Sequence, residues 1–200
     1  MPKRFKKISV VVLILALVGT SIFFFMKYKE VNKSEMTTYS LLVNRFYSYG
    51  ISIPYNSIHL VNEKINNGTL DEADVKVWLH DIISNMSIAT ETSSIASNHW
   101  NLTIGDRNRH DSVAEVSRFF ESIRVNLNDI IKTENDYTIW KQACADLEGI
   151  LKIMNSNVSE EQLADMDYSE IKVRWKELMQ LVHEQYSDSR LLKSYFALDY

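Results

Sequence analysis

Apolar residues recur with a helical period along most of this chain, and one stretch is apolar throughout. Residues 8–26 (ISVVVLILALVGTSIFFFM) form a run of nineteen residues without a charge. At a rise of about 1.5 Å per residue, a helix of this length covers roughly 28 Å, close to the hydrocarbon thickness of roughly 30 Å in a bilayer. A buried helix of a soluble protein explains the run less well, because every face of it is apolar. The stretch therefore predicts a transmembrane helix.

Basic residues at its two ends predict the orientation of this helix. Residues 1–7 contain four basic side chains and no acidic one, whereas Lys27 and Lys29 on the other side are soon followed by Glu30. The stronger positive cluster is retained in the cytoplasm. We therefore predict a cytoplasmic tail (1–7), a signal-anchor (8–26) that contacts the lipid bilayer, and a C-terminal domain outside the cell membrane.

A cleaved secretory signal is the alternative for the same stretch. Its basic start, its apolar run and the small residues 19–21 fit a signal peptide. However, the apolar run resumes at residues 22–26, which a new N-terminus would expose to water. An Ala-x-Ala cleavage motif is also missing, because Ala16 is the only alanine before Ala73. A retained anchor is favoured, and both alternatives export the rest of the chain.

Residues 27–68 are predicted to form membrane-proximal helices and a connector. Ser34 is suited to cap a helix that ends near Gly50. Residues 51–56 contain a proline and are predicted to be extended. A short helix over about 57–66 follows, with apolar residues on one face.

Four longer segments carry apolar residues at alternating spacings of three and four. The first follows the turn at Asn67–Gly68, where Thr69 and Glu72 have the spacing of a capping box. The four stripes are Val75, Leu79, Ile82, Met86, Ala89, Ser93, Ala96 and Trp100; Val113, Val116, Phe120, Ile123, Leu127 and Ile130; Tyr137, Trp140, Cys144, Leu147, Leu151 and Met154; and Ile171, Trp175, Leu178, Val182 and Tyr186.

Helices with such a repeat pack side by side at shallow angles. The sequence thus predicts an all-α fold: a transmembrane helix, extra N-terminal helices, and an antiparallel four-helix bundle over residues 69–200, with a further turn of helix at 160–164. A long helical hairpin that pairs with a second copy is the alternative. In the first stripe, Ala89, Ser93 and Ala96 form a small-residue patch, where another backbone or a bulky side chain such as Phe119 or Phe120 is expected to approach closely. Core packing is favoured there over a ligand groove.

Charge and cysteine content narrow the class of protein. The net charge of −4 conceals an asymmetry, because residues 1–29 hold six of the 22 basic side chains and none of the 26 acidic ones, which leaves −10 on the exported part. An acidic domain repels phosphate backbones, so we predict no nucleic-acid partner. Cys144 is the only cysteine, so no intramolecular disulfide forms. Its place on an apolar stripe predicts a buried structural thiol.

Candidate chemistry is sparse. The five histidines are His59, His80, His99, His110 and His183, and none has the spacing of a zinc motif. Asp106 and His110 lie four residues apart beside Arg107 and Arg109, in a segment expected to be a solvated loop. We predict no catalytic, cofactor-binding or metal-binding residue, and an enzyme is disfavoured.

Acidic residues and glycosylation sequons do not change this picture. Glu160, Glu161, Asp165 and Asp167 precede the last helix, where the helix dipole alone favours acids, and they lack the pattern of a calcium loop. Asn-x-Ser/Thr triplets begin at Asn67, Asn85, Asn101 and Asn157. The chain has many Asn, Ser and Thr residues, so chance explains most of these triplets. The Lys-, Ile- and Asn-rich, cysteine-poor composition is typical of a bacterial surface protein.

The hypothesis favoured by the sequence is a membrane-anchored helical protein that acts by contact with another envelope protein or with itself. Several aromatic residues are expected at the surface, and Tyr is enriched in interfaces: Tyr47, Tyr49, Tyr55, Tyr195, Phe196 and Tyr200. The tail 191–200 is expected to dock on its own bundle. The alternatives are a sensor-like domain that binds a small ligand and signals through a membrane partner, which the small residues 19–21 would contact, and an envelope hydrolase.

Overall fold

The computed structural model describes residues 3–104, 110–166 and 168–199; the side chains of 3–16, 97–104, 110–114 and a few single positions lie outside this description. Helix accounts for 89% of the chain, and no strand occurs among the described residues. The predicted all-α class is therefore confirmed.

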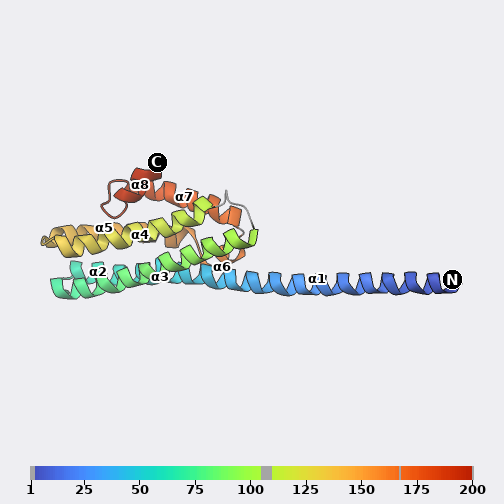
Figure 1. Ribbon diagram of the computed structural model, residues 1–200. Helices are drawn as coiled ribbons and strands as arrows, with labels where there is room; N and C mark the ends of the chain where they lie inside the picture. The colour runs from blue at the N-terminus through green and yellow to red at the C-terminus, as the bar shows by residue number, and fades with distance from the viewer. Residues whose placement is uncertain (1–2, 105–109, 167, 200) are drawn as a thin grey trace. The chain divides into compact units, whose positions relative to one another are not determined.

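Helices follow one another with short connections (Figure 1). They are α1 (Lys3–Tyr47), the π-helix η1 (Ser48–Ser52), α2 (Ile53–Asn66), α3 (Glu72–Ile104), α4 (His110–Thr133), α5 (Tyr137–Asn157), α6 (Glu160–Asp165), α7 (Tyr168–Tyr186) and α8 (Lys193–Asp199). The short helix α6 confirms the predicted turn of helix after residue 160. A capping box between Ser159 and Gln162 begins it.

The chain divides into two compact units, Met1–Tyr39 and Ser40–Tyr200. The second unit is a bundle-like arrangement of helices. Within it, α3 packs along α4, and α2 packs against α5 and α3. The helix α7 contacts α5 and α4, and α8 rests on α4. Figure 1 shows these pairs as layers, with α2 and α3 in the first, α4 and α5 in the second, and α7 and α8 in the third.

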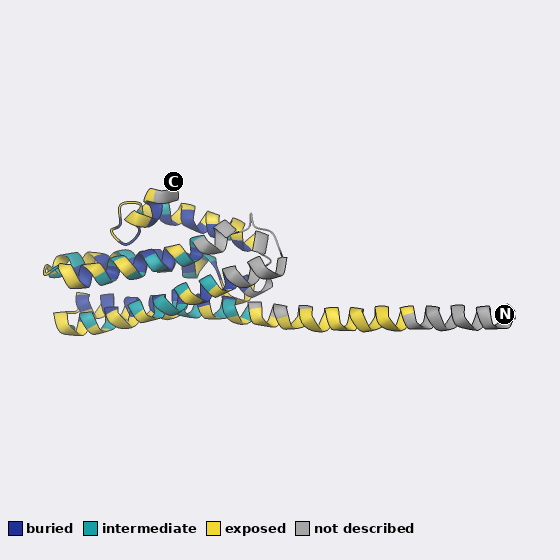
Figure 2. Cartoon of the chain, in the orientation of Figure 1, coloured by how far each residue is buried: buried dark blue, intermediate teal, exposed yellow. Residues whose placement is uncertain are grey.

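The predicted apolar stripes form the core between these layers (Figure 2). On α3, the stripe residues from Val75 to Ala96 are all buried, and those of α4 are buried from Val116 to Ile130. The stripes of α5 and α7 are buried too, except that their end members Tyr137 and Tyr186 are partly exposed. Trp100 and Val113 lie outside the described side chains. Burial of these stripes supplies the driving force for folding, since the unit has no disulfide.

A close contact fills the small-residue patch of α3. A Cβ atom added to Gly50 of η1 would lie 2.5 Å from Cζ of Phe120 and 3.0 Å from Cβ of Ala89. Both neighbours are fully buried. The expected close approach is therefore confirmed at Ala89, where the backbone of Gly50 and the side chain of Phe120 meet it.

Two predictions for the segment before residue 57 are wrong. Ser34 lies inside α1, so no helix begins there, and residues 51–56 are helical rather than extended. Pro54 falls in the first turn of α2, where its missing N–H removes no hydrogen bond of that helix. The π-helix η1 joins α1 to α2, because the N–H of Ile53 donates to the carbonyl of Ser48 five residues back.

The helix start after the first turn is also corrected. The turn itself is confirmed: Gly68 has a φ of +66°, and the N–H of Thr69 donates to the carbonyl of Lys64. However, the side chain of Asp71, not Thr69, caps α3 by accepting from the N–H of Asp74 at 2.9 Å. The Thr69 hydroxyl instead donates to the carbonyl of Lys64. The predicted capping box is therefore wrong, because Thr69 already serves the end of α2.

This assignment predicts different costs for two neighbouring substitutions. Asp71→Ala removes the N-cap of α3 and is expected to lower the free energy of unfolding by about 1 kcal/mol. Thr69→Ala removes one exposed hydrogen bond and is expected to cost less than half as much. Urea titrations followed by circular dichroism compare the two. A larger loss of stability for Thr69→Ala than for Asp71→Ala would show that Thr69, and not Asp71, caps α3.

The contact between α5 and α7 predicts an unfavourable Gly→Ala substitution. A Cβ on Gly149 would overlap the hydroxyl oxygen of Tyr186. Alanine normally stabilises a helix interior by about 0.5–1 kcal/mol relative to glycine. We expect Gly149→Ala instead to lower the free energy of unfolding by about 1–3 kcal/mol, because the site is overpacked. The control is the same substitution in a Tyr186→Ala background, where the loss should disappear.

Candidate functional site

Polar side chains of α2 and α5 meet at the surface of the second unit. His59 Nδ1 lies 2.6 Å from Glu148 Oε1, and the Asn62 side-chain amide donates to Glu148 Oε2 at 2.6 Å. The same amide donates to the backbone carbonyl of Cys144 at 3.0 Å. Because a carboxylate accepts, His59 Nδ1 is the donor in the first contact. Glu148 therefore links two side chains of α2 to α5.

His59 and Glu148 are of the types that serve as base and orienting carboxylate in a catalytic triad, but their cluster includes no nucleophile. A carboxylate that orients a histidine is one half of the charge and orientation system of nucleophilic enzymes. The His59 side chain is 57% exposed and stacks on Tyr55, with ring centroids 6.1 Å apart. Among the described residues, no hydroxyl or thiol is hydrogen-bonded to His59. The cluster thus acts as a connection between helices.

A second polar cluster attaches the C-terminal segment to α4. The backbone carbonyl of Leu191 accepts from Ser122 Oγ at 3.1 Å and from Asn126 Nδ2 at 3.0 Å. Ser122 Oγ is also 3.0 Å from Ser194 Oγ. Arg190 forms an ion pair of 2.7 Å with Glu134. These contacts fix the turn between α7 and α8.

Apolar side chains of the same segment confirm that the tail docks on its own bundle. Leu191 and Leu192 are fully buried, and Tyr195 packs edge to face against Phe119. Tyr195 and Phe196 were also expected among the surface aromatic residues, and that prediction is wrong, because both are buried. Tyr47, Tyr49 and Tyr55 are only partly exposed, and the Tyr200 prediction lies outside the described residues.

Where side chains are described, the hollows of the second unit are either open to solvent or too small for a ligand. The α4 and C-terminal segments border an open hollow of about 500 Å³ lined by Asn126, Asp129, Ile130, Arg190, Lys193, Ser194 and Ala197. Ligand sites usually enclose most of the ligand, whereas all the charged residues here face solvent. An enclosed cavity beside Trp175 has a volume of about 10 Å³. This is about the space that a single water needs.

Predicted chemical candidates do not come together. On α3, His80 and Asp81 are both exposed, and on α7 His183 packs edge to face against Phe196. Residues 105–109 and the side chain of His110 lie outside the described residues, as do His99 and the side chains of Asp165 and Asp167. Glu160 and Glu161 are exposed at the start of α6. Where side chains are described, no group of three His, Cys, Asp or Glu residues has the geometry to hold a metal ion.

The sequons are dispersed as well. Asn67 is exposed after α2, whereas Asn85 is half-buried on α3. The Asn157 side chain donates to the carbonyl of Ile153 at 2.8 Å. Asn101 lies outside the described side chains. These positions share no surface feature that would mark them as one site.

The first unit consists of the continuous helix α1 up to Tyr39, and its described side chains are exposed. Large hydrophobic side chains are exposed over 50 to 69% of their surface: Leu17, Val18, Ile22, Phe23, Phe24, Phe25, Met26, Tyr28 and Val31. In the part of the chain that the structure describes, no helix has a stretch both long and apolar enough to span a membrane. The side chains of residues 8–16, nearly half of the proposed anchor, lie outside that part. The transmembrane helix therefore stays a prediction.

Comparison with known proteins gives no relative. The chain matches no family model, no curated protein and no solved structure. The polar clusters were not found from the sequence, because their contacts join residues 56 to 89 positions apart. No local spacing signals such a pair.

Cys144 is the nucleophilic side chain on which the sequence and the structure agree. It is fully buried on α5, as predicted. Burial raises the pKa of its thiol to about 12. Since the thiolate is the reactive form, the folded protein presents an inert thiol at neutral pH.

This predicts slow alkylation of the native protein. At pH 8, well below a pKa of about 12, we expect iodoacetamide to modify native Cys144 at least about 100-fold more slowly than the urea-unfolded chain. The native rate should rise with pH as the thiolate forms. Intact-protein mass spectrometry at timed intervals measures both rates. Equal rates at pH 8 would contradict the buried assignment.

Proposed function

We propose that residues 8–26 anchor the chain in the cell membrane and that the helical unit outside acts by contact with another envelope protein. The observation that carries this proposal is the set of exposed apolar side chains on α1. Moving one such side chain from water to an apolar phase is favourable by about 1.5–3 kcal/mol. Apolar residues exposed on every side of one helix therefore require a surrounding apolar phase, which the bilayer supplies.

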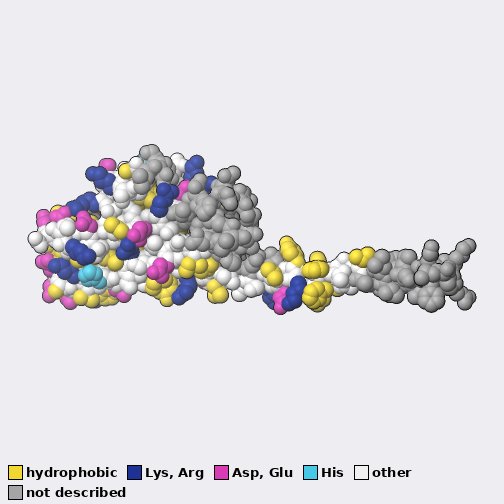
Figure 3. All heavy atoms as spheres, in the orientation of Figure 1, with side chains coloured by type: hydrophobic (Ala, Val, Ile, Leu, Met, Phe, Trp, Pro, Cys, Tyr) yellow, Lys and Arg dark blue, Asp and Glu magenta, His cyan; other side chains and the backbone are white. Residues whose placement is uncertain are grey.

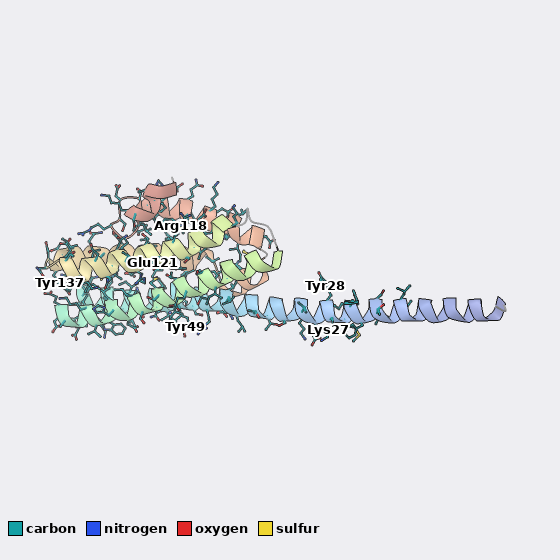
Figure 4. All side chains as sticks on the ribbon, viewed as in Figure 1. Lys27, Tyr28, Tyr49, Arg118, Glu121 and Tyr137 are labelled. Carbon is teal, nitrogen blue, oxygen red and sulfur yellow. The ribbon has the colours of Figure 1, made fainter. Side chains whose placement is uncertain are left out.

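Interactions after the apolar run support the proposed orientation. Lys27 forms an ion pair of 2.7 Å with Glu30, and this hydrogen bond lowers the pKa of the Glu30 carboxyl. One positive charge on this flank is therefore offset. Lys29 lies over the ring of Phe25, 5.1 Å from its centroid. Figure 4 shows Lys27 and Tyr28 on different sides of α1, and such aromatic and basic residues are favoured where a helix leaves the bilayer.

The closed core supports contact rather than ligand sensing or hydrolysis. Sensing requires a pocket between helices, and the enclosed cavity beside Trp175 is about 10 Å³. Hydrolysis requires converging titratable groups in a cleft, and His59 and Glu148 lie on an open surface instead. In this proposal the exported helices form an antiparallel bundle, and the protein belongs to a bacterial cell envelope. Acidic and basic side chains are mixed over the face in Figure 3, as on a surface that meets proteins rather than nucleic acid.

Topology mapping tests the anchor. A tag at the C-terminus of the full chain is expected to be cut by protease added to intact cells whose outer layers have been permeabilised. The chain should stay in the membrane fraction after alkaline extraction, and its N-terminus should begin before residue 8. Replacing the four basic residues of 1–7 by Gln should reduce the protected N-terminal fraction, whereas Lys27→Gln with Lys29→Gln should leave it unchanged. A protected C-terminal tag, or an uncut chain in the aqueous fraction, would refute the proposal.

A further inference from the structure

The layer formed by α2 and α3 packs one face on α4 and α5, and its other face exposes side chains of both helices. On α3, Val77 and Ile95 are five helical turns apart, and Asp81 and Glu91 lie within about 40° of them, so the four side chains share one stripe. This stripe is opposite to the buried one. In Figure 2 the side of α2 and α3 turned away from α4 and α5 has the colours of exposed and intermediate residues. We name this side the α2–α3 outer face.

Bulky apolar side chains are exposed on the outer face. Val77 is 69% exposed and Ile95 is 56% exposed on α3. On the neighbouring α2, Leu60 is 44% and Ile53 is 39% exposed, seven residues apart on the same side. Single exposed apolar residues are normal on a protein surface. Here four of them share one layer, so a partner that covers the layer would bury all four.

Carboxylates outnumber basic groups on this face. Glu63, Asp81 and Glu91 are exposed and form no ion pair with a described residue. Lys64 of α2 is exposed on the same side and lies over the ring of Trp78, 5.7 Å from its centroid, so it offsets part of this charge. Elsewhere in the second unit, Glu134 is paired with Arg190 and Glu177 with Arg174. The remaining negative charge makes the outer face complementary to a basic surface.

We propose that the α2–α3 outer face is the docking surface of the protein and that its partner presents lysine or arginine side chains around an apolar centre. This inference rests on the proposed contact function and assigns the surface that carries it. A second copy of the chain does not fit, because it would bring the same carboxylates into opposition. Anionic lipid headgroups are excluded by the same repulsion. Apolar burial at Val77 and Ile95 supplies affinity, and the carboxylates select a basic partner.

Site-specific photo-crosslinking in native cells locates the surface. A photoreactive amino acid is placed singly at Val77 and Ile95 in the full chain. The matched control position is Val173 on α7, which is 59% exposed. We expect the same adduct from the first two positions and at least about tenfold less from the control. The crosslinked peptide of the partner, identified by mass spectrometry, is expected to be rich in lysine or arginine.

Charge reversal tests the basic character of the partner. Asp81→Lys with Glu91→Lys is expected to lower the adduct yield from position 77 by about tenfold, since like charges then oppose each other. Glu161→Lys with Asp188→Lys changes the net charge equally at exposed positions on other elements, and it should leave the yield unchanged. Unchanged urea midpoints for both variants show that folding is preserved.

Each outcome decides between the two proposals. Adducts confined to position 173, a partner peptide without basic residues, or a crosslink to a second copy would overturn the outer-face inference and leave the contact function standing. Adduct yield that resists charge reversal would also overturn it. If no position on α2, α3, α5 or α7 gives an adduct in native cells, both the inference and the contact function fail.

Discussion

The second unit depends on how closely η1, α3 and α4 approach at Gly50. This glycine has no side chain, so the ring of Phe120 and the methyl of Ala89 occupy the space that a Cβ would need. Helix axes separate by the thickness of the side chains between them, and between η1 and α3 only the methyl group of Ala89 intervenes. The close approach brings the buried stripe of α3 onto α4, which in turn supports the helices packed behind α4. A disulfide bond cannot replace this packing, because the chain has a single cysteine.

Polar contacts decide details that the apolar core leaves open. A stripe of leucine, isoleucine and valine tolerates several alignments of two helices, because apolar contact is not directional. The contacts of Glu148 with His59 and Asn62 fix α5 relative to α2. Those of Ser122 and Asn126 with the carbonyl of Leu191 fix the turn before α8. These polar clusters therefore account for how the helices are aligned, and the described titratable side chains outside them do not converge on a catalytic site.

The two units make different demands on their surroundings. Residues of α1 such as Phe24 and Met26 expose apolar surface on all sides, which water disfavours. Residues of the second unit bury their apolar stripes against one another, and acidic and basic side chains are scattered over the face that Figure 3 shows. In the proposed function, α1 stays in the membrane while the helical unit meets its partner in water. The outer face of α2 and α3 is the place where apolar and unpaired acidic side chains coincide.

The sequence by itself determined the all-α class, the buried stripes from Val75 to Val182 and the burial of Cys144, because apolar periodicity is a local property of a helix. It did not determine helix ends, since the choice of Asp71 over Thr69 depends on where the preceding helix stops. It also misjudged Pro54, because a proline that breaks one helix can begin the next. Only the tertiary structure decided that Glu148 meets His59 and that Tyr195 and Phe196 are buried. Those contacts join residues far apart in the chain, and packing alone brings them together.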